Sequence, residues 1–188
     1  MSITFRARML RRIPARRVML KWGHLLMIPL FIWFVLVTPD DVVPIGNWAF
    51  MVHSNLALIF VSGCLIWTID HMFRGLASRP GPKLPKWARR VHKVMHKTII
   101  WGLFLVALGG FLLGLTSHKL LKAGGFLPIA PPMNWHKANE IIGTLHIYQF
   151  YALGVLIVGH ALFHIWRHLW LRDNVLRIMA PKVLHKWL

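Results

Sequence analysis

Apolar residues dominate four stretches of the chain, and each stretch is long enough to cross a membrane. A helix needs about 20 consecutive apolar residues to span the hydrocarbon core of a bilayer. The pattern therefore predicts four transmembrane helices, at about residues 18–38, 48–69, 98–116 and 141–166. With 188 residues and 56% hydrophobic content, the chain is too short for several large domains and too apolar for an ordinary soluble protein. We expect a single membrane domain over residues 1–188, built as an all-α, integral membrane four-helix bundle.

Basic residues lie almost entirely on one side of this predicted bundle. Lys and Arg number 7 in residues 1–23, none in 39–47, 8 in 70–97, 3 in 117–140 and 5 in 167–188, so 20 of 23 share one side. The positive-inside rule then predicts that both termini and the middle loop are cytoplasmic. The net charge of +18 does not indicate a nucleic-acid partner, because the charges fall between long uncharged apolar runs.

The two longer loops differ in character. The middle loop, DHMFRGLASRPGPKLPKWARRVHK, is basic and rich in proline, and it is expected to be a connector that lies against anionic lipid headgroups. The outer loop, SHKLLKAGGFLPIAPPMNWHKANE, carries an apolar patch that suggests contact with the membrane surface or a partner, and its prolines break any long helix. Cys64 is the lone cysteine and no C-x-x-C-H sequence occurs, which excludes the usual covalent attachment of c-type haem.

Four histidines lie at membrane depth, where an ionisable side chain is by default a functional candidate. His146 and His160 are 14 residues apart in the fourth span. This spacing leaves them roughly 40° apart around a helix and roughly 21 Å apart along it. Alternating topology places His24 at the depth of His160 and His53 at the depth of His146. Because neutral imidazole is an ordinary axial ligand of haem iron, the pattern predicts two bis-histidine haem b sites, one above the other.

Other assignments of these histidines stay open at this stage. His164 faces the same way as His146 but would lie near the headgroups, so its depth argues against a ligand role. His92 and His96, just before the third span, are possible substitutes as cytoplasmic ligands. The histidines at membrane depth are also compatible with hydrogen bonds across helices or a proton path. A single zinc ion is disfavoured, because ligands in two layers about 21 Å apart cannot share it.

The remaining histidines lie near the ends of the spans or in loops. His164 and His168, one turn apart, are candidates to bind haem propionates or a quinone head, or to be interfacial. We expect the others to be solvated or interfacial: His71, His118, His136 and His185.

Several short sequences resemble the bacterial cytochrome b561 family, and more specifically its diheme superoxide oxidase branch, over roughly residues 18–180. They are KWGHLL in the first span, FMVHSN in the second, the 14-residue histidine pair in the fourth, and the tail HLWLRDNVLRIMAP. The resemblance implies that His24, His53, His146 and His160 are the haem ligands. It also implies a multi-pass protein of the bacterial inner membrane.

The resemblance further implies electron transfer between the quinone pool and an outer-face donor or acceptor, as a superoxide:ubiquinone oxidoreductase. Its quinone site corresponds to Lys83 in PGPKLPK and His168 in WRHLW. Lys119, Lys122 and Lys137 in the outer loop are candidates to steer an anion such as superoxide. The third span lacks the proline that the family often has near LGG, and the outer loop does not match the family.

Two rival functions are compatible with the same residues. The chain is alternatively the haem-b membrane subunit of a larger dehydrogenase or hydrogenase, with the apolar segment GGFLPIAPP docking an outer-face redox protein. A haem-free alternative is a small proton-linked transporter built round buried histidines.

Overall fold

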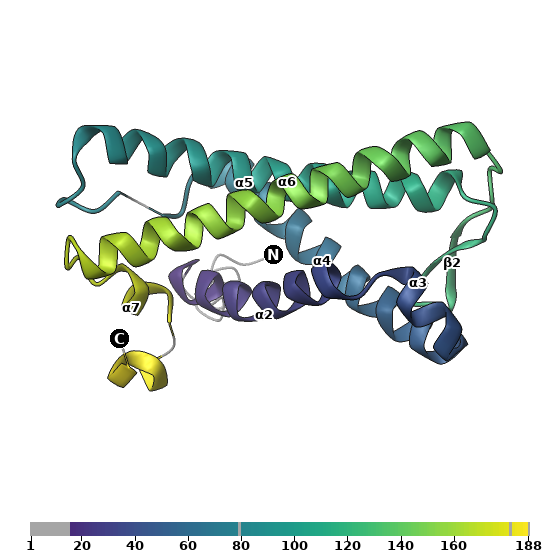
Figure 1. Cartoon of the computed structure of the whole chain (residues 1–188), viewed down its shortest axis with the longest axis horizontal. Coiled ribbons are helices and arrows are strands. Elements are labelled where there is room, and N and C mark those ends of the chain that lie inside the picture. Colours follow the sequence, from purple (N-terminus) through teal and green to yellow (C-terminus); the bar gives the residue numbers. More distant parts are fainter. Residues whose placement is uncertain (1–15, 79, 181, 188) are drawn as a thin grey trace, which may run out of the picture.

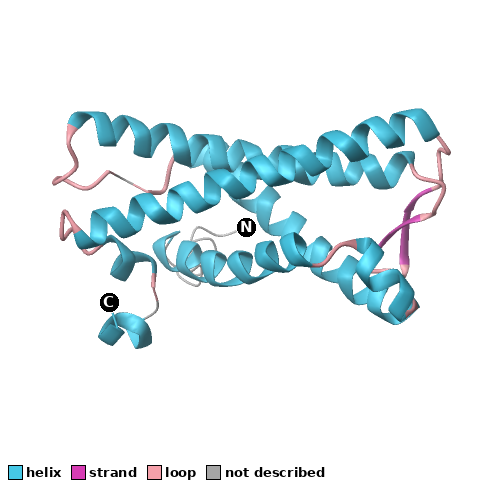
Figure 2. Ribbon diagram, in the orientation of Figure 1, coloured by secondary structure: helices cyan, strands magenta, loops and turns pink. Residues whose placement is uncertain are grey.

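The computed structural model describes residues 16–78, 80–180 and 182–187. Within them, four helices are long and apolar enough to cross a membrane (Figures 1 and 2). They are α2 (Arg16–Leu36), α4 (Asn47–Arg74), α5 (Lys86–Thr116) and α6 (His136–Leu169). The prediction of a mostly helical chain with four helices long and apolar enough to cross a membrane is confirmed.

Three of these helices, α4, α5 and α6, are longer than the apolar pattern predicted. α5 begins at Lys86, well before residue 98, because Pro85 is followed by good helix formers that continue the helix beyond its apolar part. α4 continues to Arg74 and ends at Gly75, whose φ of 67° is readily adopted only by glycine. The connector between them is therefore shorter than the predicted middle loop.

Short elements connect α2 to α4 and α5 to α6, at the end of the bundle where α2 and α5 end. α3 (Pro39–Val42) and the 3₁₀ helix η1 (Val43–Ile45) join α2 to α4. Strands β1 (Leu121–Ala123) and β2 (Leu127–Ala130) pair antiparallel between α5 and α6. This hairpin is a small departure from the all-helical prediction, and its turn uses Gly124 and Gly125, both at positive φ. After α6 come α7 (Val175–Met179) and the 3₁₀ helix η2 (Lys182–Trp187).

The helices form an incomplete ring. α5 packs against α6 and α4, and α4 packs against α2, whereas α2 and α6 make few backbone contacts (Figure 1). A stacked pair of rings bridges that gap, with the centroids of Phe31 and Phe150 4.9 Å apart. The buried core lies beside the gap and consists of Met27, Leu30, Phe31, Phe60, Cys64, Leu103, Val106, Ala107 and Leu153.

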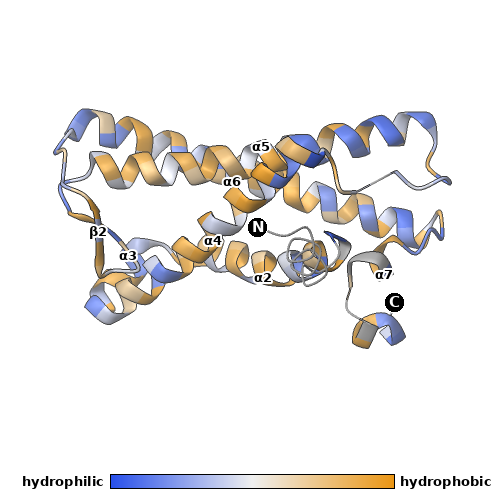
Figure 3. Ribbon diagram, turned by 180° about the vertical axis from the view of Figure 1, so that it is seen from behind, coloured by the Kyte–Doolittle hydropathy of each residue, from blue (hydrophilic) through white to orange (hydrophobic). Residues whose placement is uncertain are grey.

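The outward faces of the bundle are apolar along its middle and polar at its ends (Figure 3). Large apolar side chains such as Ile66, Val155 and Leu162 are exposed there. Such continuous exposure is expected for a surface that lipid covers. We call the end where α2 and α5 begin and α4 and α6 end the basic end, and the opposite end, with β1 and β2, the hairpin end.

Candidate functional site

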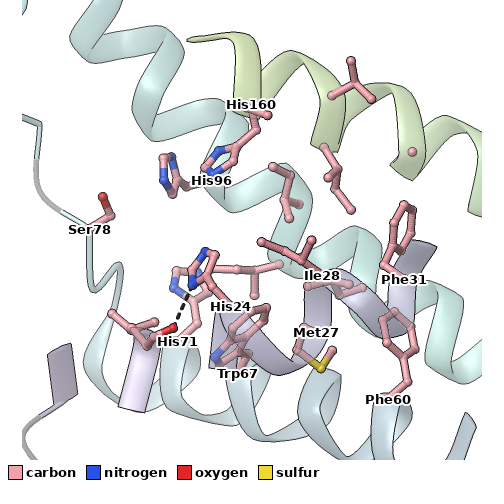
Figure 4. A pocket seen from close by; sticks show the side chains of 18 of the residues that line it. His24, Met27, Ile28, Phe31, Phe60, Trp67, His71, Ser78, His96 and His160 are labelled. Atoms are coloured by element: carbon pink, nitrogen blue, oxygen red, sulfur yellow. Dashed lines mark hydrogen bonds between the residues drawn. The ribbon is translucent and has the colours of Figure 1, made fainter. Parts of the chain in front are cut away.

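A cavity of about 770 Å³ occupies the gap between α2 and the other three long helices (Figure 4). Its volume is within the range of pockets that hold cofactor-sized ligands. The walls are mostly aliphatic and aromatic, and they include Phe31, Phe60, Trp67 and Phe150. The charged and imidazole side chains on its lining are Arg16, His24, Asp70, His71, His96 and His160. An apolar chamber with several imidazoles is suited to a flat, apolar group that carries a metal.

The two histidines predicted to form the pair nearer the basic end line this one cavity. His24 comes from α2, and His160 comes from α6 on the other side (Figure 4). The His24 Nδ1 lies 2.8 Å from the carbonyl oxygen of Leu20, so Nδ1 carries the proton and donates, which leaves the lone pair on Nε2. The ring of Trp67 packs on His24 with centroids 5.1 Å apart. His24 is thus held in the tautomer that ligates metal through Nε2.

His160 is half-buried and has no comparable restraint. Its Nδ1 has no hydrogen-bond partner among the described residues. A buried polar atom left without a partner costs about 1–3 kcal/mol, so this ring nitrogen is an atom that a ligand or a water would satisfy.

Two further histidines line the cavity. His96 Nδ1 donates to the carbonyl oxygen of His92 at 2.7 Å, and its ring centroid lies 4.7 Å from that of His160. The sequence hypothesis that His96 can substitute as a ligand is therefore compatible with its position. His71, which was expected to be solvated or interfacial, is half-buried near the end of α4, and its ring lines the cavity.

The pair predicted nearer the hairpin end is less complete. His53 is buried, and its Nδ1 accepts a hydrogen bond from the indole Nε1 of Trp33 at 3.3 Å. His146 packs against α5 beside Gly109 and Gly110. Among the described residues no ring contact or hydrogen bond joins the two histidines.

The site nearer the basic end fits a haem b group, on the evidence of the cavity, the Nε2 of His24 and the unpartnered Nδ1 of His160. At the other site, ligation through the Nε2 of His53 requires a proton on Nδ1, and the bond from Trp33 is then lost. At 3.3 Å that bond is longer than the usual range for a hydrogen bond of this type, so its loss costs little.

The predicted quinone residues lie at the basic end, outside the lining of the cavity. Lys83 Nζ donates to the carbonyl oxygen of Arg172 at 2.9 Å, which ties the middle loop to the segment that follows α6. His168 lies in the last turn of α6, near that segment. Gly81 lies against Arg167 and Asp173 at the same place. The loop and the end of α6 are therefore neighbours, as a shared site requires.

His92 and His164, both open to other roles in the sequence, are buried near His96 at the basic end. His164 is 6% exposed, so its ring is buried within the bundle and does not snorkel at the interface. His118 and His136, which were expected to be solvated or interfacial, are exposed at the hairpin end.

No known protein-family model matches the sequence, and no curated protein matches it significantly. The likeness to cytochrome b561 proteins therefore remains an interpretation of the motifs and of the geometry above.

Proposed function

We propose that the chain is a diheme b-type membrane cytochrome of the b561 kind, which transfers electrons between ubiquinone and a redox partner at the hairpin end. The observation that carries this proposal is the apolar cavity with His24 on one wall and His160 on another. These two residues would hold one haem b, and His53 and His146 would hold the second. Haem b held by two imidazoles would supply one-electron chemistry.

The residues around the cavity have identifiable tasks. The carbonyl of Leu20 and the ring of Trp67 orient His24, and the stacked pair Phe31 and Phe150 bounds the chamber. The apolar lining excludes water and lowers the local dielectric, which is how a protein tunes a bound redox group. Arg16 at the mouth of the cavity is a cation within reach of carboxylate groups on a ligand, although Asp70 already accepts two of its hydrogen bonds.

The orientation that we propose places the basic end and both termini in the cytoplasm of a bacterial cell, with the protein in the inner membrane. The distribution of Lys and Arg supports it. Quinone would then bind near Lys83 and His168 and take protons from the cytoplasm. Superoxide is the donor that we propose at the hairpin end, where the cations Lys119, Lys122 and Lys137 raise the local concentration of an anion.

A second candidate is a haem-b subunit of a larger dehydrogenase or hydrogenase. The hairpin favours it, because Phe126, Leu127 and Ile129 are exposed there beyond the long helices. Exposed apolar side chains on a polar end are typical of a docking surface for a protein partner. The chain alone would then show no turnover with superoxide.

The experiment that tests the proposal measures haem per chain and the reduced-minus-oxidised visible spectrum of the purified full chain. We expect about two haems b with low-spin bands. His24→Ala and His160→Ala should each remove one haem, His53→Ala and His146→Ala the other, and His185→Ala, outside both sites, neither. A colourless wild-type protein would overturn the proposal and favour the proton-linked transporter. If His96→Ala removes a haem and His160→Ala does not, the ligand assignment changes to His96.

Turnover separates the two candidate functions. Superoxide-dependent reduction of ubiquinone by the isolated chain supports the oxidoreductase, whereas a haem-loaded but inactive chain supports the subunit. Lys83→Ala should lower quinone reduction and leave the haem spectrum unchanged, because Lys83 lies outside the cavity.

A further inference from the structure

Three histidines at the basic end form a cluster beside the proposed haem site, and one of them, His96, also lines the haem cavity. His92 and His96 are one turn apart on α5, and His164 reaches them from α6. One ring nitrogen from each lies within 4.8 Å of those of the other two. His92 is fully buried and His164 is 6% exposed. We call these three residues the histidine cluster.

The hydrogen bonds of the cluster leave ring nitrogens without partners. Nδ1 of His92 and Nδ1 of His164 are buried and have no hydrogen-bond partner among the described residues. The other ring nitrogen of His92, Nε2, lies 3.1 Å from the hydroxyl of Ser78. His96 donates through Nδ1 to a backbone carbonyl, so its lone pair is on Nε2. The three rings therefore offer nitrogen lone pairs, and the described residues provide few hydrogen-bond donors to pair with them.

We propose that the histidine cluster binds a divalent first-row transition-metal cation, with Zn²⁺ the best suited. Imidazole nitrogen is a preferred ligand of Zn²⁺, Cu²⁺ and Ni²⁺, whereas Ca²⁺ and Mg²⁺ require oxygen. Nitrogens around tetrahedral zinc are about 3.3 Å apart, given bonds of about 2.0–2.1 Å. The rings need to approach by no more than about 1.5 Å, which side-chain rotation provides. Three ligands leave a fourth position for water.

The surroundings of the cluster are compatible with a bound cation. Its α5 histidines precede the apolar part of that helix, at residues 98–116, so the site lies near the basic end and not at the centre of the membrane. The nearby guanidinium of Arg167 is paired with the carboxylate of Asp173 at 2.7 Å, which neutralises its charge. Ser78 fixes one side of His92, as a second shell does for a metal ligand. The site needs neither His24 nor His160 and does not rest on the proposed electron transfer.

The test is a metal titration of the full chain, purified through a tag without histidine and stripped with a chelator. Zn²⁺ affinity is measured by competition with a chromophoric chelator, and Co²⁺ is added as a spectroscopic probe. We expect about one Zn²⁺ per chain and the visible bands of tetrahedral Co²⁺. His92→Ala and His164→Ala should each weaken Zn²⁺ binding by about 100-fold or more, since even second-shell losses reach that range.

His185→Ala is the control and should bind Zn²⁺ as the wild type does. The thermal midpoint of every variant reports whether it is folded, and His164→Gln replaces His164→Ala if the latter does not fold. His24→Ala should keep Zn²⁺ whatever happens to its haem. The proposal is overturned if wild-type affinity equals that of the cluster variants, or if His164→Ala loses haem in step with Zn²⁺, which would make His164 a haem ligand.

Discussion

Gly109 offers a test of the haem site nearer the hairpin end that leaves the ligands themselves in place. A methyl group at Gly109 would lie 2.9 Å from Nδ1 of His146, about 0.5 Å inside ordinary van der Waals contact, which begins near 3.4 Å. At the next residue, Gly110, the nearest atom of the same ring is 3.4 Å from an added methyl. The ring of His146 must therefore move for Gly109→Ala and can stay for Gly110→Ala.

The expected size of the effect follows from the tolerance of a metal site. Ligand geometry has to be held within about 0.5 Å, and the displacement that Gly109→Ala requires is of that size. We expect haem per chain to fall from about two towards about one. Both substitutions gain about 1 kcal/mol in helix propensity, so a difference between them reports the contacts of the Gly109 methyl with the His146 ring and with Oε1 of Gln149 at 3.1 Å.

The assay is haem per chain of both variants in parallel, with the low-spin spectrum and the thermal midpoint recorded for each. Gly109→Ala should lose the signal that His146→Ala loses and keep the signal that depends on His24. Equal haem content in the two glycine variants would refute the placement of His146 as an axial ligand. Loss of both haems together with a lowered midpoint would instead mark a general packing fault on α5.

Two ionic contacts give further expectations. Asp173→Asn leaves Arg167 buried without its counter-charge, both side chains being at most 5% exposed, and should cost about 3–5 kcal/mol of unfolding free energy in denaturant titrations. Asp70→Asn, in a pair whose side chains are 26% and 24% exposed, should cost about 1 kcal/mol or less, and equal costs would contradict the difference in burial. The backbone N–H and hydroxyl of Thr38 donate to Asp41 and hold its pKa below the ordinary 3.8. The ionised Asp41 carboxylate therefore stabilises the folded state fully above about pH 4, and this stabilisation is lost as the pH falls through the lowered pKa. The thermal midpoints of wild type and Asp41→Asn should differ at neutral pH and converge in acid.

The number and order of the long helices were predictable from the sequence, because each needs only a run of apolar residues. The start of α5 was not, since residues 86–97 carry basic side chains that a hydropathy pattern assigns to a loop. The hairpin was missed because it is held by a glycine turn and by Asn55, which donates to the carbonyl of Gly124 from a distant helix. Contacts between elements far apart in sequence leave no local pattern.

The positions of the candidate site residues along their helices were predictable from the sequence, but the directions in which their rings point were not. Spacing along α6 put His160 level with His24, and both line the cavity. The same depth also held His71 and His96, and periodicity alone cannot say which ring turns inward, because that depends on how each helix is rotated in the bundle.

What distinguishes these rings is their hydrogen bonds. His24 and His96 each donate through Nδ1 to the carbonyl four residues earlier, which any helical histidine can do without help from another helix. His160 and His164 do not make this bond, and their buried Nδ1 atoms have no partner among the described residues. His24 on α2 and His96 on α5 therefore have a fixed tautomer, whereas a bound group or water would be needed to satisfy His160 and His164 on α6. If the haem and metal sites are both occupied, loss of His96 should disturb both, whereas loss of His24 should disturb only the haem.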